Sequence, residues 1–319
     1  MAYSLDNLPR LSVLVVVRNA ATTVARTMDS LLAQHYPNLE VIVWDGLSTD
    51  GTLDVLARYS SLITTLRSEK DKGSSDGYNR AMALATGDYV GILNADDEYE
   101  PGALWAVADC LIQKPNAEVV TFGMLFHTNH KVTGYYADEV QLSLTLERVL
   151  SDIPSFVPSR FFRRTLLAEI GPIETDMRLW YYANDREYMT RWAVRGCKNN
   201  IIPKALYRFE LHEKGISNNP DNYMRIIEEH SMIAAHLLKD TRLSASQCST
   251  IERWRERQLM FGFWIGLFTG KISHAKNFMR EGFRLKGWRI VPLAFCVLAE
   301  KLLKRLGLKL SSGIDRGII

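Results

Sequence analysis

The chain carries at residues 87–98 the stretch GDYVGILNADDE, and the interpretation of its fold starts from this stretch. Residues 89–93 are mostly apolar, as in a short strand buried on both faces, and two adjacent carboxylates, Asp96 and Asp97, follow directly. In an open α/β sheet, ligands bind at the carboxyl ends of the strands. A carboxylate pair there suits a hard divalent cation that also binds a phosphorylated substrate. The stretch therefore predicts a sheet strand with a metal and phosphate site at its end.

The same two acids also have a purely structural interpretation. Asp is favoured just before the first turn of a helix, because its carboxylate accepts hydrogen bonds from the first N–H groups and interacts well with the helix dipole. The dipeptide alone does not separate a helix start from a site. The choice depends on the other predicted strands.

Three apolar runs precede this stretch and alternate with helical patterns. Residues 11–17, 39–44 and 63–67 predict strands, and helical patterns follow the first and third of them. This alternation predicts an α/β fold with a doubly wound, mainly parallel sheet and helices on both faces. Three of the first four strands end at or just before an Asp, and three acids that converge on one sheet edge favour a site over separate helix caps.

Composition sets the broad class of the protein. The 319 residues are 47% hydrophobic and 24% charged, which is ordinary for a folded chain that can bury a large core. The net charge of +3 is unevenly distributed: residues 251–319 hold 14 Lys and Arg against 5 Asp and Glu, or +9, so residues 1–250 carry −6. No feature indicates nucleic-acid binding.

The cysteines and the apolar runs give an expectation about the compartment. Cys110, Cys197, Cys248 and Cys296 are scattered without a metal-binding spacing, which favours buried thiols in a reducing compartment. The first ten residues contain no apolar signal-peptide region, and no apolar run approaches the ~18 to 20 residues of a spanning helix. The sequence therefore predicts a cytoplasmic protein.

Four short motifs, in a fixed order over ~90 residues, resemble those of the family 2 glycosyltransferases of the GT-A fold. They are VVVRN at 15–19, VWDGLSTDGT at 43–52, SEKDKG at 68–73 and LNADD at 93–97, and weaker matches continue to about Ser217. The resemblance implies a GT-A type sheet, a nucleotide-sugar donor, usually a UDP-sugar, and a divalent metal, Mn²⁺ or Mg²⁺. It also implies transfer with inversion at the anomeric carbon.

The resemblance assigns a set of donor-binding residues. Asp45 matches the acid that accepts a hydrogen bond from the nucleobase imide, a role that suits a carboxylate because it can only accept. A simple turn role is the alternative for Asp45, and an ordinary solvated position is the alternative for Lys72. The donor-binding residues that the resemblance implies are Val17, Arg18, Asn19, Asp45, Asp71, Lys72, Asn94 and Asp96.

Metal and catalytic roles follow from the same resemblance. Asp97 matches the direct metal ligand, with Asp96 near the ribose or the water shell of the metal. His212 is a second metal-ligand candidate, and a solvated loop residue is its alternative. Asp185, in the run ANDREY at 183–188, matches the catalytic base, and an N-cap or first-turn position of a helix is its alternative. Many relatives carry a His where this chain has Val157.

The C-terminal region leaves the common core of the family. We expect a GT-A domain over 1–218, with a nucleotide-sugar half at 1–115 and an acceptor half at 116–218, and a helical, basic extension over 219–319. Gly262, Gly266 and Gly270 stand at four-residue spacing, which lets helices approach closely. Residues 251–309 predict either binding to an anionic membrane surface or packing of the helices on each other or on a second subunit.

The sequence therefore favours a metal-dependent inverting glycosyltransferase. Its expected acceptor is a glycan or a polyprenyl-linked sugar, and its expected place is the cytoplasm or the inner face of the cell membrane. A nucleotidyltransferase for sugar phosphates would need a glycine-rich loop after the first strand, and Arg18-Asn19-Ala20-Ala21 has no glycine. A non-catalytic sugar-binding module would be expected to lack Asp97 or Asp185, and both are present.

Overall fold

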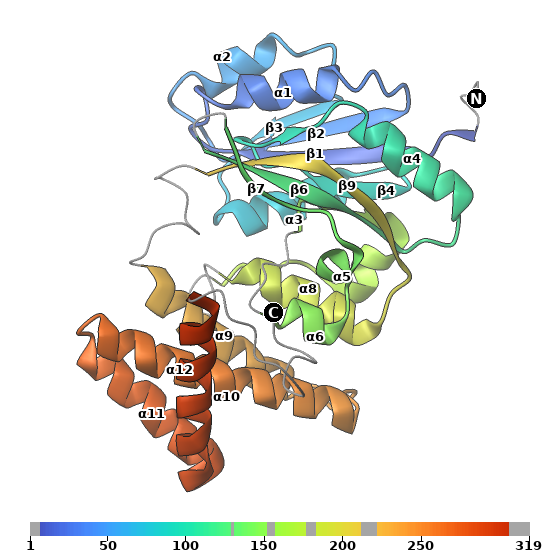
Figure 1. Ribbon diagram of the computed structural model, residues 1–319. Coiled ribbons are helices and arrows are strands. Elements are labelled where there is room, and N and C mark those ends of the chain that lie inside the picture. Colours follow the sequence, from blue (N-terminus) through green and yellow to red (C-terminus); the bar gives the residue numbers. More distant parts are fainter. Residues whose placement is uncertain (1–6, 129–130, 152–156, 177–182, 212–221, 306–319) are drawn as a thin grey trace. The chain divides into compact units, whose positions relative to one another are not determined.

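The computed structural model describes residues 7–128, 131–151, 157–176, 183–211 and 222–305 (Figure 1). The chain forms two compact units. The first consists of Met1–Leu144, Phe156–Thr175 and Arg195–His212, and the second of Thr145–Ser155, Asp176–Val194 and Glu213–Ile319. The second unit thus takes two segments from inside residues 1–218. The expected domain boundary after residue 218 lies outside the described residues.

The first unit contains the alternating strands and helices that the sequence predicts. Its strands are β1 (Leu11–Val17), β2 (Leu39–Asp45), β3 (Thr65–Ser68), β4 (Tyr89–Ile92), β5 (Glu98–Tyr99), β6 (Val119–Thr128), β7 (Lys131–Tyr136), β8 (Arg160–Arg163) and β9 (Asn199–Glu210). Its helices are α1 (Val24–Leu32), α2 (Thr52–Ala57), α3 (Ser74–Leu84), α4 (Ala103–Gln113), α5 (Glu139–Leu142) and α7 (Leu167–Ile170), with a short 3₁₀ helix, η2 (Arg164–Leu166).

The strands of the described residues form one sheet in the order β3-β2-β1-β4-β8-β6-β9-β5, with β7 paired to β6. β1 is parallel to β2 and β4, and β2 is parallel to β3, so the N-terminal half of the sheet is parallel, as predicted. Beyond β4 the sheet is mixed: β8 is antiparallel to β4 and β6, and β9 is parallel to β6 but antiparallel to β5. The α/β fold is therefore confirmed.

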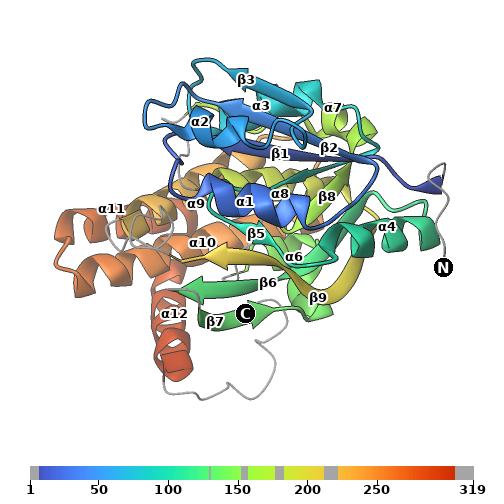
Figure 2. The same cartoon turned by 90° about the horizontal axis from the view of Figure 1, so that it is seen from above.

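Helices cover both faces of this sheet (Figure 1, Figure 2). On one face, Val13, Val15 and Val17 of β1 belong to an apolar core that also holds residues of α1 and α4. On the other face, α3 packs on β1 and β2. A Cβ atom at Gly77 of α3 would lie only 2.7 Å from Cγ1 of Val16, so this close approach requires glycine.

A buried acid, Glu40 of β2, connects three segments of the first unit. Its carboxylate accepts hydrogen bonds from Oγ of Ser12 at 2.5 Å, from the N–H and Oγ1 of Thr86 at 2.8 and 2.6 Å, and from Arg10 at 3.2 Å. Burial alone would raise the pKa of Glu40. The hydrogen bonds from Ser12, Thr86 and Arg10 outweigh burial and lower this pKa to about 2.

The second unit is helical in its described part. Its elements are α6 (Leu146–Val149), α8 (Asn184–Arg195), α9 (Tyr223–Leu237), α10 (Ala245–Phe268), α11 (Ile272–Lys286), the 3₁₀ helix η5 (Gly287–Arg289) and α12 (Ile290–Arg305). α10 packs against α9, α11 and α12, and it begins with a capping box formed by Ser244 and Gln247. α8 extends one residue, Arg195, beyond this unit.

The glycines of α10 serve helix packing. A Cβ at Gly262 would lie 2.7 Å from the ring of Phe278, and one at Gly266 would lie 2.9 Å from atoms of Ala275. The close approach expected from the glycine spacing is confirmed for Gly262 and Gly266, with α11 as partner, whereas Gly270 lies beyond α10 and a Cβ there would meet nothing within 4 Å. No helix of the described residues combines the length and the apolarity that a bilayer-spanning segment needs.

The expectation of buried thiols is wrong. All four cysteines are free, Cys110, Cys197 and Cys248 are half-buried, and Cys296 is exposed. Cys296 lies on the side of α12 that does not pack on α10, because the buried residues in the described part of this helix are Ile290, Ala294, Val297 and Glu300.

The role of Glu40 gives a stability prediction. Glu40→Gln replaces one acceptor oxygen with an NH₂ group that faces donors, and we expect a loss of ~1–3 kcal/mol in the free energy of unfolding at pH 7. Because the folded pKa is lower than the ordinary value of 4.5, the advantage of the wild type should be complete above pH 4.5 and disappear as pH falls towards about 2. Denaturant unfolding across this range measures it, with exposed Glu139→Gln as control. Equal stabilities at pH 7 would contradict the proposed contribution.

Candidate active site

The carboxyl ends of β1, β2 and β4 lie side by side, because these strands are parallel neighbours. Val17 is in register with Asp45, and Leu14 with Ile92. The structure therefore brings together the three strand ends that carry Asn19, Asp45 and the Asn94–Asp97 run. This edge of the sheet is the candidate site.

Asp45 is fully buried at the end of β2. Its carboxylate accepts hydrogen bonds from the N–H of Ser48, at 3.1 and 3.3 Å, and from Oγ of Ser68, at 2.6 Å. Leu47, which precedes Ser48 in this turn, has a φ of 59°, a left-handed conformation that is strained for a residue with a bulky side chain. The turn role that was the alternative for Asp45 is thus real, and its carboxylate still has acceptor capacity for another donor.

The end of β1 fixes the loop that follows β2. The N–H of Asn19 donates to Oγ of Ser48 at 2.8 Å, and Oδ1 of Asn19 accepts from the N–H of Thr49 at 2.9 Å. Asn19 has a φ of 53°, which asparagine tolerates better than most residues. Val17 and Arg18, which precede Asn19, were also expected to bind the donor. Val17 is buried in the core, and Arg18 is exposed.

Asp71 lies against the same loop, and Lys72 extends into solvent. A Cβ at Gly46 would stand 2.8 Å from Oδ2 of Asp71, so the missing side chain makes room for this carboxylate. Oδ1 of Asp71 accepts from the N–H of Gly73 at 3.0 Å. Lys72 is exposed, its backbone N–H donates to Asp76 at 3.1 Å, and its ammonium pairs with no acid among the described residues.

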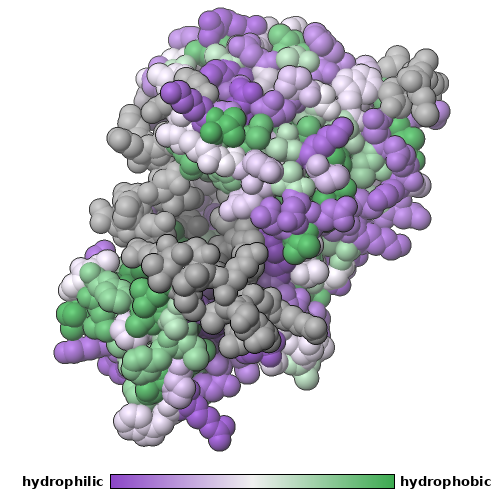
Figure 3. All heavy atoms as spheres, in the orientation of Figure 1, coloured by the Kyte–Doolittle hydropathy of each residue, from purple (hydrophilic) through white to green (hydrophobic). Residues whose placement is uncertain are grey.

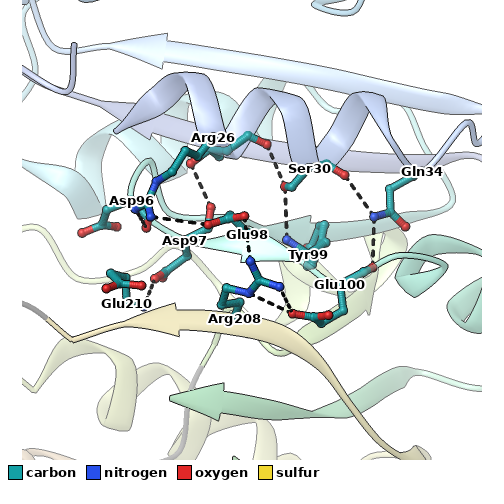
Figure 4. A network of polar contacts seen from close by, with 11 residues as sticks. Arg26, Ser30, Gln34, Asp96, Asp97, Glu98, Tyr99, Glu100, Arg208 and Glu210 are labelled. Atoms are coloured by element: carbon teal, nitrogen blue, oxygen red, sulfur yellow. Dashed lines mark hydrogen bonds and ion pairs between the residues drawn. The ribbon is translucent and has the colours of Figure 1, made fainter. Parts of the chain in front are cut away.

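The end of β4 is held by a network around the buried carboxylate of Asp97 (Figure 4). Oδ2 of Asp97 accepts from the hydroxyl of Tyr207 at 2.6 Å and from Nδ2 of Asn94 at 2.8 Å, and Oδ1 accepts from the N–H of Glu210 at 3.0 Å. Tyr78 donates in turn to Oδ1 of Asn94 at 2.8 Å. Asn94 is therefore a positioning residue in this network.

Burial dominates the electrostatics of Asp97. Burial raises the pKa of Asp97 most, and the nearby charge of Asp96 adds a smaller increase, so that this pKa is about 7. The hydrogen bonds from Tyr207, Glu210 and Asn94 act in the opposite direction. Burial and the Asp97 charge also raise the pKa of Tyr207, which keeps its hydroxyl protonated as a donor.

Asp96 differs from Asp97 in exposure and direction. It is half-buried, and its side chain points away from the hydrogen bonds that hold Asp97 (Figure 4). Asp96 is therefore the more accessible of the two adjacent carboxylates.

Arginines on both sides fix the chain that follows Asp97 (Figure 4). Arg208 of β9 contacts Glu98 at 3.2 Å and Glu100 at 2.6 Å, and Arg26 of α1 contacts Glu98 at 3.6 Å. These ion pairs connect α1, β5 and β9 around the site.

The sequence interpretation missed two residues of this network, Tyr207 and Glu210, both on β9. Oε2 of Glu210 is buried and accepts no hydrogen bond from the described residues. The strand-end rule that found Asp45 could have found Glu210, because this residue is the last of β9. Nothing local marks Tyr207, whose partner is 110 residues away.

Asp185 belongs to the second unit, where it is exposed in the first turn of α8. The helix begins at Asn184, so Asp185 lies inside it and does not occupy the N-cap position. Glu187, an alternative base, is buried and paired with Arg191 at 2.9 Å. Predicted His212 lies outside the described residues. The described residues contain no group of three or more acids, His or Cys arranged to hold a metal ion.

The network around Asp97 gives a second prediction. Tyr207→Phe removes one of its three donors and leaves the N–H of Asn94 without the Tyr207 oxygen, so we expect a loss of ~1–2 kcal/mol in unfolding free energy. Tyr99→Phe is the matched control, because this buried hydroxyl makes one long bond, 3.4 Å, to the carbonyl of Ile92. Thermal and denaturant unfolding measure both. Equal losses of unfolding free energy in the two variants would show that the hydrogen bond from Tyr207 to Asp97 adds no measurable stability.

Similar proteins come from sequence comparison. A model described as "Glycosyl transferase family 2" matches residues 12–215. EpsE of Bacillus subtilis (strain 168), a glycosyltransferase by description, is 33% identical over 130 residues, which cover 40% of this chain and 47% of EpsE. The PGL/p-HBAD biosynthesis glycosyltransferase Rv2957 of Mycobacterium tuberculosis is 28% identical over 176 residues, 54% of this chain and 66% of that protein. The chain thus spans between about half and two thirds of these relatives.

Solved structures show the same fold over most of the chain. S. aureus TarS 1–349 in complex with UDP-GlcNAc has a TM-score of 0.69 at 18% identity and covers 97% of this chain and 95% of its own. The mannosyltransferase PcManGT from Pyrobaculum calidifontis, with GDP-Man and Mn²⁺, has a TM-score of 0.61 at 20% identity, with 93% and 82% covered. At these identities the likeness concerns the fold, which is GT-A-like. Since the family model covers most of the first 215 residues, the chain belongs to glycosyl transferase family 2.

Proposed function

We propose that this chain transfers a sugar from a nucleotide-diphosphate donor, a UDP-sugar, to a hydroxyl group of a glycan or polyprenyl-linked acceptor, with inversion at the anomeric carbon. The observation that carries the proposal is the meeting of Asp45, Asp96 and Asp97 at the carboxyl edge of neighbouring parallel strands. In α/β sheets this edge binds ligands. Family membership supplies the reaction class.

On the donor side, Asp45 is proposed to accept the imide N–H of the nucleobase. A carboxylate suits this N–H because it accepts and cannot donate. Asn19 and Asp71 hold the surrounding loop, so the acid is positioned before the donor arrives. The solved TarS complexes with UDP-GlcNAc and with UDP support a uridine nucleotide.

On the acceptor side, the names of relatives support a surface polysaccharide or glycolipid. TuaG of Bacillus subtilis is described as a teichuronic acid biosynthesis glycosyltransferase. WfaP of Escherichia coli is described as a glucosyltransferase that acts on GlcNAc-diphosphoundecaprenol. We propose an acceptor of this class and therefore a cytoplasmic protein that works at the inner face of the membrane.

The donor set fits a divalent cation, Mn²⁺ or Mg²⁺, since such ions take one or two carboxylates plus phosphate oxygens. Asp97 was the expected ligand, but Asp96 is the more accessible of the two carboxylates, and the three bonds to Asp97 tie its loop to β9. We therefore propose that Asp96 contacts the metal and that Asp97 holds the loop that presents it. The orphan oxygen of Glu210 is a further acceptor on the same side of the network. A bound cation would offset the charge that grows on the leaving diphosphate.

This division of roles predicts different outcomes at neighbouring acids. Asp96→Asn should weaken Mn²⁺ binding in the presence of UDP at least tenfold, because it removes an anionic ligand, with little change in melting temperature. Asp97→Asn should lower the melting temperature, because its amide cannot accept all three bonds. Calorimetric titration of Mn²⁺ and thermal unfolding measure both. Loss of Mn²⁺ affinity in Asp97→Asn, with Asp96→Asn unchanged, would restore Asp97 as the direct ligand.

Asp185 is proposed as the general base that takes the proton of the acceptor hydroxyl as that oxygen bonds to the anomeric carbon. An inverting transfer needs such a carboxylate on the acceptor side. Asp185 is exposed in the first turn of α8. The neighbouring Arg186 anchors the helix start through the carbonyls of Val149 and Ser151.

Asp185→Asn tests this role. The variant should cut transfer by roughly two to four orders of magnitude, because the amide cannot accept the proton. Donor affinity and melting temperature should barely change, because asparagine keeps the size of the side chain and much of its capping ability. Asp185→Ala should behave in the same way, whereas a capping role would have lowered its stability by ~1 kcal/mol. An active Asp185→Asn enzyme would move the search to Glu187 or Asp176.

The alternatives are weaker. Membership of a glycosyltransferase family leaves a nucleotidyltransferase without support. A non-catalytic binding module is tested by a panel of nucleotide sugars, each scored for metal-dependent binding and hydrolysis. Binding without any turnover across the panel would favour the module.

A further inference from the structure

One face of α12, continued by the turn before it, is both apolar and exposed. Its residues follow the period of a helix, with Trp288 82% exposed, Phe295 62% and Leu302 49%. The residues of this face, which we name the apolar stripe, are Trp288, Pro292, Phe295, Cys296, Ala299 and Leu302. The opposite face of α12 is also apolar, and it fills the core of the bundle with Ile290, Ala294 and Val297. Phe295 and Trp288 each touch one ring of the unit, Trp264 and Phe283, but most of their surface stays exposed.

The stripe widens into a patch through the end of α10. Phe268 is 69% exposed and stacks on Trp264 with ring centroids 5.9 Å apart, and Trp264 meets Phe295 at 6.0 Å. Nε1 of Trp264 donates to the carbonyl of Ala294, which fixes the ring between the two helices. Figure 3 shows hydrophobic side chains gathered over α11 and α12. An exposed patch of this kind marks a contact surface.

Exposed cations belong to the same helices. Lys276 and Arg280 lie one turn apart on α11, and Arg289 precedes α12. No ion pair joins these three to any carboxylate of the described residues. Three acids of the region are already engaged, because Glu281 pairs with Arg284, Glu300 with Arg257 and Glu256 with Lys286, which leaves Glu252 of α10 as an exposed acid against these three cations. The surface therefore keeps an uncompensated positive charge.

We infer that the apolar stripe of α12 and the exposed cations of α11 and η5 bind the surface of an anionic lipid bilayer. Bulky apolar side chains on basic helices enter the interface, while Lys and Arg meet anionic headgroups. Trp288 suits the boundary, because its ring has an apolar body and a polar N–H. A second copy of the chain is disfavoured as occupant, since it would bring the same uncompensated cations.

The inference goes beyond the transfer reaction and is tested without it. Co-sedimentation with vesicles of phosphatidylcholine and phosphatidylglycerol (about 7:3) should carry down the full chain at low salt, and much less at ~1 M salt, where screening is short-ranged. Pure phosphatidylcholine should retain little. Lys276→Gln with Arg280→Gln should weaken binding roughly 25-fold, about fivefold for each cation lost. Phe295→Glu with Leu302→Glu should abolish it.

A matched control lies on β7 of the first unit, where Val132 and Tyr135 are 58% and 69% exposed. Val132→Glu with Tyr135→Glu should leave vesicle binding unchanged. Melting temperature and UDP binding should be equal in all variants, which separates this inference from the proposed function. Wild-type protein that ignores anionic vesicles at low salt would overturn the inference. So would a wild-type dimer that Phe295→Glu with Leu302→Glu dissociates while vesicle binding stays intact.

Discussion

The buried carboxylate of Asp97 is the constraint on which the candidate site depends. A carboxylate taken out of water is costly unless donors surround it. Its donors come from Asn94 in the same loop and from Tyr207 and Glu210 on β9. The carboxylate therefore ties the ends of β4 and β9, which are not neighbours in the sheet. Burial, together with the nearby charge of Asp96, raises the pKa of Asp97 in spite of these bonds.

This tie explains why two adjacent acids can differ in role. Asp96 lies in a turn in which the N–H of Asp97 donates to the carbonyl of Asn94 at 3.2 Å, and its side chain points away from the bonds that hold Asp97 (Figure 4). The ion pairs of Arg208 with Glu98 and Glu100 then fix the chain beyond the pair. The sequence alone does not separate the roles of Asp96 and Asp97. Their different hydrogen-bond partners and exposure in the fold do.

The sequence predicted what local patterns encode. The parallel strands β1, β2 and β4 are continuous apolar runs, and the acid at the end of β2 follows from the strand-end rule. The antiparallel pairing of β8 and the hydroxyl of Tyr207 could not be predicted, because they depend on partners far along the chain.

The division of the chain into two units also depends on contacts between distant residues. The start of the helical pattern predicts a boundary after residue 218, but the compact units are set by which apolar faces pack together. Leu146 and Ala183, from inside the expected catalytic domain, share a core with Ile233 of α9 and Trp254 of α10. Asp185 therefore belongs to the helical unit, while Asp45 and Asp97 belong to the sheet.

The helical unit also shows why an apolar residue count does not reveal a surface. α12 has apolar residues on two faces, and its sequence alone fits a helix buried all round. The bundle covers one face, with Ile290 and Val297, and leaves Trp288 and Phe295 outside. Exposure of those rings costs free energy in water, roughly 25 cal/mol for each Å² of apolar area. The chain can fold with this outer face exposed because the inner face of α12 holds the bundle together. When an apolar phase covers the outer face, the free-energy cost of its exposure to water is recovered.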